Sequence, residues 1–429
     1  MALPHTPLVA EPTQASFSSS VLSSLALFHL PGVGATRYQK LIEWFGSAEA
    51  TINGDRKFII AAGVKPESVR LLDDYVHRSL NSDIGRLVKQ DLDWADKSGN
   101  DLLLIDDPDY PPLLKHIDCP PPVLYIKGSR ALVSEPQLAI VGSRSPSIDG
   151  KENAYRFAKS MVNVGLAVTS GMALGVDGAA HKGAIDNHGH TIAVVGTGAD
   201  VIYPARHRAL SAGILEQGAI VSELPLGTQP HPSNFPRRNR IISALSLGVL
   251  VVEASPKSGS LITAHYALDQ GREVYAIPGS IHNPMARGCH QLLRQGAKLV
   301  ESAEDIFEEL SSLLAFHQHL RNEAVHTNTS HAKPVNKLPA HGTADLFEHE
   351  IGAKSEYDPT FDNLHAELTE AETTLLSLLG YDVVSVDLAV ERSELPVEEI
   401  SILLMSLELK GLVQSVPGGF QKVRDIITA

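Results

Sequence analysis

Between His231 and Arg240 the sequence concentrates side chains that bind nucleic acids. Three arginines lie within four residues, next to an aromatic ring and an amide. Guanidinium groups bind phosphates, and an aromatic ring stacks on a base whatever its sequence. The alternative is a solvated charged turn with its ring in the core. The spacing favours single-stranded nucleic acid, with these candidate residues: Phe235, Arg237, Arg238, Asn239 and Arg240.

A second candidate follows the run LAIVGSR, which has the composition of a buried strand. In an open parallel sheet, ligands bind beyond the carboxyl ends of the strands. We expect Gly142 to let the backbone approach a ligand, Ser143 to supply a hydroxyl and Arg144 to bind a phosphate. A plain strand-to-helix turn with a surface arginine is the alternative. G-x-G-x-x-G and Walker A sequences are missing, so neither dinucleotide nor nucleoside-triphosphate binding is indicated.

Three further strand ends carry weaker signals. Gly171 lies in a Ser-Gly turn before a predicted helix start, which suits an anion. Arg206 is predicted at a helix start, where the helix dipole disfavours cations, so an anion nearby is expected. We expect Asp177 to cap a helix and Glu253 to pair with an arginine. The start of a helix at Gly259 should offer free N–H groups.

The elements that position these residues are predicted by alternation. Six apolar, β-branched runs between residues 138 and 310 are separated by helical segments of about 10–15 residues, a pattern of βαβ units. The fold class is therefore α/β, with a Rossmann-like parallel sheet. The runs are LAIVGS, LAVTSG, TIAVVG, AIVSEL, GVLVVEAS and EVYAIPG.

Other segments flank this domain. Residues 1–20 are expected to be a disordered tail, 21–90 a helical module of the helix-hairpin-helix (SAM-like) kind, and 91–137 a Pro-rich connector without regular helix. Within the helical module, Pro31, Gly32 and Gly34 separate two helical stretches. Such a turn either presents N–H groups to a phosphate or is an ordinary helical hairpin.

Towards the C-terminus, residues 311–362 are expected to be a linker. Residues 363–429 are predicted to form a winged helix, opening with a capping box at Thr369 and Glu372 and closing with a hairpin.

Charge and composition limit the classes of protein to which this chain could belong. The net charge is −14, made of 13 basic and 17 acidic residues in 1–137, 15 of each in 138–310, and 8 and 18 in 311–429. A polyanion should therefore approach the middle segment. Two cysteines exclude a disulfide framework, no histidine spacing fits a metal site, and no apolar run could span a bilayer. A cytoplasmic protein without metal or cofactor is expected.

Together the segments resemble the bacterial DNA-processing protein A family (DprA, also called Smf). The resemblance covers about residues 20–425, with His290 replacing the family's usual Asn, and rests on IVGSR, TSGMALGVDGAAH, GTGADVIYP, NFPRRNRIIS, VVEASPKSGSLITA and IPGSIHNPMARGCHQLLRQGA.

The resemblance implies binding and protection of incoming single-stranded DNA in natural transformation, loading of RecA recombinase, and a homodimer through the Rossmann-like domain. It also implies that Arg144, Phe235, Arg238 and Arg240 line the DNA pocket.

Two other functions remain open. A Rossmann-like phosphoribohydrolase would carry PGGxGTxxE, but the related stretch here is SPKSGSLITA, which lacks that glutamate. A transcription factor would read DNA with the winged helix, but its probable recognition helix carries Glu398, Glu399 and Glu408. We therefore expect no catalytic residues, and a winged helix that contacts protein.

Overall fold

The computed structural model of the protein describes residues 18–311 and, near the C-terminus, residues 368–379, 383–393, 395–410, 412–416 and 418–422. The expected tail up to residue 17 and the expected linker from residue 312 lie outside the described residues. Residues 19 and 20 were wrongly assigned to the tail. They begin helix α1 (Ser19–Phe28), whose N-cap Ser18 accepts a hydrogen bond from the Val21 amide.

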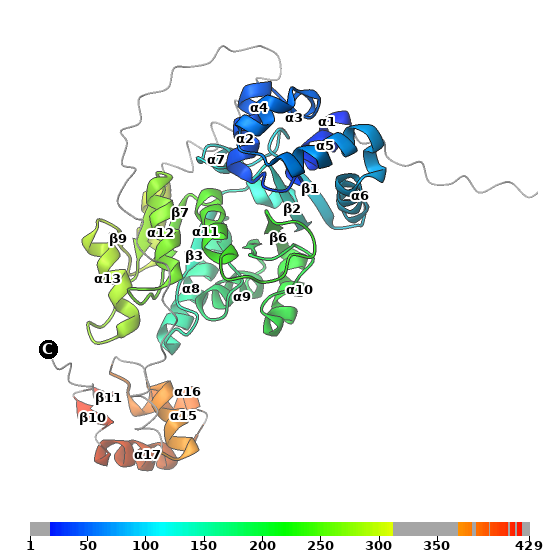
Figure 1. The fold of residues 1–429 in the computed structure, drawn as a ribbon. Coiled ribbons are helices and arrows are strands. Elements are labelled where there is room, and N and C mark those ends of the chain that lie inside the picture. Colours follow the sequence, from blue (N-terminus) through cyan, green and yellow to red (C-terminus); the bar gives the residue numbers. More distant parts are fainter. Residues whose placement is uncertain are drawn as a thin grey trace, which may run out of the picture.

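A nine-stranded sheet forms the middle of the molecule, in the order β1-β2-β6-β5-β4-β3-β7-β8-β9 (Figure 1). All six runs predicted as strands are strands, and each pairs in parallel with the next of its kind in the sheet. This confirms the Rossmann-like fold class. The strands are β3 (Gln137–Val141), β4 (Ala167–Ser170), β5 (Thr191–Val194), β6 (Gly218–Ser222), β7 (Gly248–Val251) and β8 (Glu273–Ala276), with β9 (Lys298–Leu299) parallel to β8.

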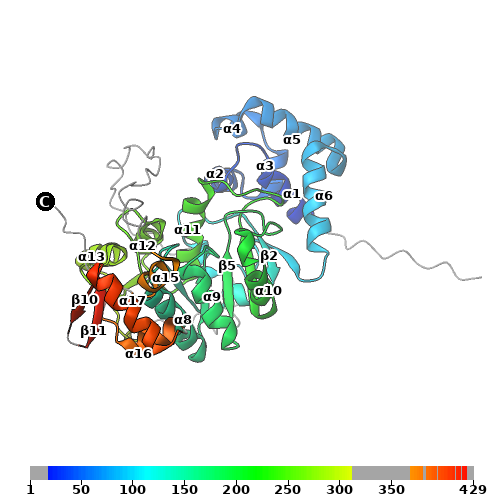
Figure 2. The same cartoon turned by 90° about the horizontal axis from the view of Figure 1, so that it is seen from below.

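Helices cover both faces of the sheet, which is why its strands are apolar throughout rather than alternating. Along β3, Ala139 and Val141 face one core and Leu138 and Ile140 face the other. The first core is closed by α11 (Asn234–Leu245), α12 (Gly259–Asp269) and α13 (Arg287–Arg294). The opposite face, visible in Figure 2, is covered by α8 (Ile148–Asn163), α9 (Val176–Asp186), α10 (Arg208–Gln217) and the helical residues 303–311.

The expectation of a Pro-rich connector over residues 91–137 was wrong. This segment supplies two strands of the sheet, β1 (Asn100–Leu104) and β2 (Val123–Gly128), and a short helix, α7 (Pro112–Lys115). Strand β2 pairs antiparallel with β6, and β1 pairs antiparallel with β2. The prolines lie outside both strands, where no ladder N–H is needed, and Pro112 begins α7, so they mark the ends of strands rather than a spacer.

The N-terminal helices pack onto the sheet extension made by β1 and β2. Tyr125 of β2 donates to Asp91 at 2.7 Å, and its ring lies 5.8 Å from that of Trp94. Asp91 also lies 2.6 Å from the His29 ring nitrogen. The predicted helical module is therefore joined to the sheet by one core. Its remaining helices are α2 (Ala35–Phe45), α3 (Ala48–Asn53), α4 (Arg56–Ala61), α5 (Pro66–Arg78) and α6 (Asp83–Ala95).

The C-terminal described stretches form the predicted winged helix, with a core of their own. Thr369 and Glu372 form the predicted capping box. Arg392 makes an ion pair with Asp149 at the start of α8. The elements are α15 (Glu370–Leu378), α16 (Val386–Ser393), α17 (Val397–Leu409) and the hairpin β10 (Val413–Val416) and β11 (Gly419–Lys422).

A buried histidine in α9 makes the stability of this fold sensitive to acid. His181 is fully buried. One ring nitrogen lies 2.7 Å from the Thr191 hydroxyl, and the other has no hydrogen-bond partner among the described residues. Burial, aided by the charges of His207 and Arg238, lowers its pKa from 6.5 to about 3. The folded state therefore keeps His181 neutral at a pH where the unfolded chain protonates it.

We predict that His181→Asn, which can retain the bond to Thr191, reduces the acid sensitivity of folding. Between about pH 6 and pH 3 the wild-type free energy of unfolding should fall by about 1.4 kcal/mol per pH unit more than that of the variant. Urea denaturation at several pH values measures this difference. Equal slopes for both proteins would contradict the assignment.

Candidate functional site

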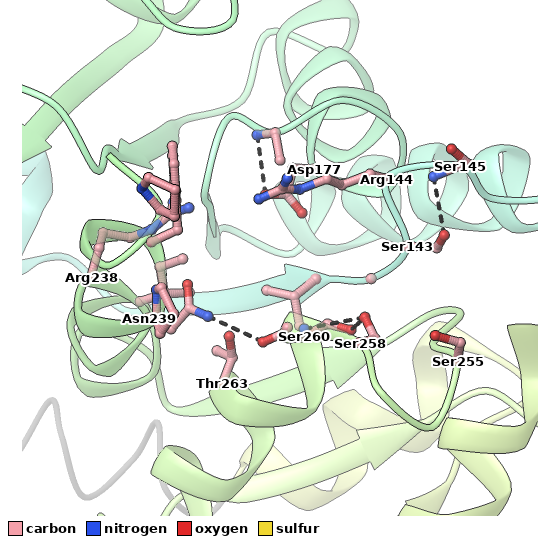
Figure 3. A pocket seen from close by; sticks show the side chains of 18 of the residues that line it. Ser143, Arg144, Ser145, Asp177, Arg238, Asn239, Ser255, Ser258, Ser260 and Thr263 are labelled. Atoms are coloured by element: carbon pink, nitrogen blue, oxygen red, sulfur yellow. Dashed lines mark hydrogen bonds between the residues drawn. The ribbon is translucent and has the colours of Figure 1, made fainter. Parts of the chain in front are cut away.

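A cavity of about 750 Å³ opens where strands β3 and β7 end (Figure 3). The sheet continues to β4 on one side of β3 and to β7 on the other, so this is the point where the strand order reverses and where α/β proteins bind ligands. Six predicted residues line the cavity: Gly142, Ser143, Arg144, Phe235, Arg238 and Asn239. The other four, Gly171, Arg206, Arg237 and Arg240, are not among its lining residues.

A cation and two aromatic rings form one wall. The exposed Arg144 guanidinium lies 5.6 Å from the centre of the Phe235 ring, within range of a cation–π contact. Phe235 in turn lies 5.7 Å from Tyr203, whose side chain is 43% exposed. These groups offer flat surfaces and a positive charge side by side. Tyr203 was missed as a site residue, although its position just after the third predicted strand was a usable signal.

The start of helix α12 forms the opposite wall. Gly259, Ser260 and Thr263 line the cavity, and Ser258 caps the helix by accepting from the Ser260 amide at 3.3 Å. Asn239 donates to the Gly259 carbonyl at 3.1 Å, which ties α11 to α12. Because a helix N-terminus carries partial positive charge, this wall favours a phosphate. Figure 3 shows Arg144 and Asp177 on one side and Ser258, Ser260 and Thr263 across from them.

Helical geometry divides the arginine cluster. The segment is a helix from Asn234, not a turn, and five of its residues line the cavity: Phe235, Pro236, Arg238, Asn239 and Ile242. All of them except Pro236 recur at spacings of three and four, so they share one face of the helix. Arg237 and Arg240 lie on another flank and share Glu223. Arg237 approaches it at 3.3 Å, while Arg240 forms an ion pair with it and donates to the Cys119 carbonyl at 2.6 Å. The three arginines therefore do not converge on one ligand.

Arg238 lies beneath the cavity floor rather than in the open. It is only 5% exposed, and it donates to the Val194 carbonyl at the end of β5. Burial lowers its pKa to about 10, against the opposing effect of the Asp177 charge. Asp177 accepts hydrogen bonds from the amides of Gly171 (3.1 Å) and Ala173 (3.2 Å). Burial raises the pKa of Asp177, and the charge of Arg238 offsets part of that rise.

Two predicted glycines are required by packing within the protein. A Cβ on Gly142 would lie 2.7 Å from Val176 Cγ2 and 2.9 Å from the Glu253 carbonyl oxygen. A Cβ on Gly171 would lie 2.1 Å from the Arg238 guanidinium. Gly142 therefore lies close to α9 and to the residues that follow β7, while its expected approach to a ligand stays a prediction. Gly171 makes room for Arg238.

Two further predictions concern the charged residues Glu253 and Arg206. Glu253 was expected to pair with an arginine; instead it accepts from the Ser147 amide (2.8 Å), the Ser147 hydroxyl (2.6 Å) and the Asn283 amide (3.0 Å), so that prediction was wrong. Arg206 lies exposed on a single turn, Ala205–His207, three residues beyond Tyr203. Arg206 is not among the residues that line the cavity, and its expected contact with DNA stays a prediction.

Comparisons with known proteins agree along most of the chain. Residues 101–311 match the family model described as DNA recombination-mediator protein A, and residues 359–419 match the DprA winged helix domain. Protein Smf of Escherichia coli K12 is 40% identical over 338 residues, 79% of this chain and 81% of that protein. DNA processing protein DprA of Bacillus subtilis 168 is 45% identical over 215 residues, 50% of this chain and 72% of that protein.

A solved structure is also similar. The X-ray structure of DNA processing protein A from Streptococcus pneumoniae superposes with a TM-score of 0.59 at 34% identity, covering 67% of this chain and 97% of that one.

We predict that Gly171→Ala destabilises the protein, because the new methyl group must displace the buried Arg238 guanidinium. The expected loss is about 1–3 kcal/mol of unfolding free energy, measured by urea denaturation. Gly259→Ala is the matched control: it lines the same cavity but has no atom within 4 Å of the added Cβ, so its change should stay below about 0.5 kcal/mol. Equal stability of both variants would refute the packing described for Arg238.

Proposed function

Since the chain belongs to the DprA/Smf family of DNA-processing proteins, we propose that it binds single-stranded DNA in the cavity at the ends of β3 and β7. The observation that carries this proposal is the wall formed by Arg144, Phe235 and Tyr203 facing the start of α12. Rings and guanidinium planes stack on unpaired bases, while the helix start and Arg144 receive phosphate oxygens.

The chemistry of the cavity favours a strand over a duplex or a dinucleotide. Bases in a duplex are stacked on each other and cannot lie on Phe235 or Tyr203. A dinucleotide would call for the glycine fingerprint after the first strand, where this chain has Gly-Ser-Arg-Ser-Pro. Stacking and phosphate contacts carry no base code, so binding with little sequence preference is proposed.

We also propose that the protein performs no covalent chemistry. Asp177, which lines the cavity, is held by backbone amides, and Glu253, which lies outside the cavity lining, is held by Ser147 and Asn283. A nucleotide-processing enzyme of the phosphoribohydrolase type remains the alternative, because the cavity lies where such enzymes bind nucleotides. Release of free base from nucleoside monophosphates would favour that alternative.

The family model's description as a recombination mediator supports a wider role. We propose that a homodimer, formed through the Rossmann-like domain, protects incoming DNA in the cytoplasm during natural transformation and loads RecA onto it.

We further propose that the winged helix contacts protein. Helix α17 exposes Ile402 (70%), Met405 (65%) and Leu409 (85%) beside the acidic Glu398 and Glu408. Apolar and acidic groups on this helix suit a protein partner and would repel phosphates.

We predict that Arg144→Ala and Phe235→Ala weaken binding to single strands without unfolding the protein. Loss of a stacked base costs about 1–3 kcal/mol, or about 5- to 150-fold in affinity, and loss of a phosphate contact should also reduce the salt dependence. Titration of a fluorescent single strand, repeated at several salt concentrations, measures both effects.

Arg156→Ala is the control, because this arginine is exposed on α8 and, in the part of the chain that the structure describes, forms an ion pair with Glu152 of the same helix. A fluorescent duplex of the same sequence should bind more weakly than the strand. If the wild type preferred duplex, or if Arg144→Ala bound as tightly as the control, the proposed function would be abandoned.

For the winged helix, we predict that Leu409→Glu leaves the affinity for both single-stranded and duplex DNA unchanged within about twofold, since α17 is not part of the DNA site. The same titrations measure this. A loss of duplex binding in this variant would mean that α17 reads DNA.

A further inference from the structure

A second cavity, of about 760 Å³, lies between the N-terminal helical module and the sheet domain. One side is the start of α2, the other sides come from α11, α12 and the residues that follow α7. It is lined by Gly34, Ala35, Thr36, His116, Ile117, Asp118, Cys119, Arg237, Arg240, Tyr266, Asp269, Gln270 and Arg272. Arg237 and Arg240 lie on the flank of α11 that faces away from the first cavity. In the second cavity they lie near Gly34, at the turn before α2.

We propose that this cavity binds a backbone phosphate of the DNA strand whose bases occupy the first cavity. The inference rests on the proposed function and extends it: the protein would have two phosphate-binding sites, one on each flank of α11.

The first argument is the set of donors in the cavity. Arg237 is half exposed and shares Glu223 with Arg240, so it is only partly neutralised. Arg272 donates one N–H to the Leu113 carbonyl at 3.1 Å, but its buried Nε has no hydrogen-bond partner within the described structure. The Arg272 side chain lines the cavity, so its other terminal N–H groups can donate to a phosphate oxygen there.

The second argument is the helix start. Helix α2 has eleven residues, and its N-cap Gly34 provides no side-chain cap, so the first-turn amides are left without that partner. Arg37 holds the turn in place by donating to the Gly32 carbonyl at 2.6 Å. The N-terminal partial charge of α2 therefore acts on the same space as Arg237 and Arg272.

The acidic residues of the cavity indicate which phosphate it takes. Asp118 and Asp269 also line it. A free phosphate monoester carries a charge of about −1.5 to −2 at neutral pH, whereas a backbone phosphodiester carries one negative charge. Two carboxylates repel a dianion more strongly than a monoanion. The cavity is therefore better suited to a phosphodiester within a strand than to a free nucleotide.

The two cavities are close enough for one strand to reach both. Arg237 and Arg238 are neighbours in α11, and a helix with its side chains is about 10–12 Å across. The residues before α11, His231 to Ser233, are exposed, so a strand can pass over the start of this helix. A strand of only a few nucleotides fills the first cavity, and a longer one engages the second.

The test compares fluorescent oligonucleotides of about 5 and about 15 nucleotides, a range that spans the usual site sizes of single-strand binders. The full-length protein is titrated as wild type, Arg237→Gln, Ala35→Pro and the control Arg156→Gln. Proline suits the first helical position, and the extended backbone of Gly34 (φ −92°, ψ −178°) tolerates it, so Ala35→Pro removes one amide donor while the helix remains.

We expect the wild type and the control to bind the longer strand more tightly than the shorter one. Arg237→Gln should lose about tenfold in affinity for the longer strand, and Ala35→Pro several-fold, while both keep wild-type affinity for the shorter strand. Thermal melting, unchanged from the wild type, shows that each variant is folded.

Two results would overturn the inference. If both folded variants bound the longer strand more tightly than the shorter one by the same factor as the wild type, the second cavity would not bind the strand. If adenosine monophosphate bound the wild type, measured by calorimetry, and binding were lost in Arg237→Gln, the cavity would be a nucleotide site instead. Failure of the proposed function looks different, because Arg144→Ala would then leave the affinity for both lengths unchanged.

Discussion

The burial of the Arg238 guanidinium against Gly171, with the charge of Asp177 acting on it, is the interaction on which the geometry of both cavities depends. The guanidinium comes from α11, lies against the turn after β4, and donates to the last residue of β5. Asp177 of α9 provides the opposite charge and holds the turn through the Gly171 and Ala173 amides. A buried charge without its partner is strongly destabilising, so α11 cannot rotate or slide without breaking this contact.

Because α11 is fixed in this way, each of its polar residues can face only one of the two cavities. With Arg238 pointing inwards, Phe235 and Asn239 must face the ends of β3 and β7, and Arg237 and Arg240 must face Glu223 and the N-terminal module. A short polar sequence therefore contributes to two separate surfaces. Glu223 limits how much positive charge α11 presents on its second flank, because it pairs with Arg240 and approaches Arg237.

The sequence was most informative where one physical pattern dominated. Six buried strands, the winged-helix elements and the capping box at Thr369 could be predicted because β-branched runs and capping residues act locally. Strands β1 and β2 were missed because prolines flank their short apolar runs. What stabilises them lies far away in the sequence, in the pairing of β2 with β6 and in the packing of both strands against the N-terminal helices. Phe235, Arg238 and Asn239 of α11 were identified, but the division of this segment between two flanks depends on helical phase, and the sequence analysis assigned no helix here. The position of Tyr203 after a predicted strand was a usable signal, but its contact with Phe235 depends on a distance that sequence spacing does not contain.

The antiparallel strands β1 and β2 have a consequence for how the protein unfolds. Tyr125 and Val123 of β2 belong to the core of the N-terminal helices, while Leu124 and Ile126 of the same strand belong to the core beneath α11. One strand is thus buried on both sides by two modules that differ in architecture. Loss of either module would leave half of β2 in water, so residues 19–311 behave as a single cooperative unit rather than as two independent domains. A domain boundary placed between the N-terminal helices and the sheet would therefore cut through one folding unit.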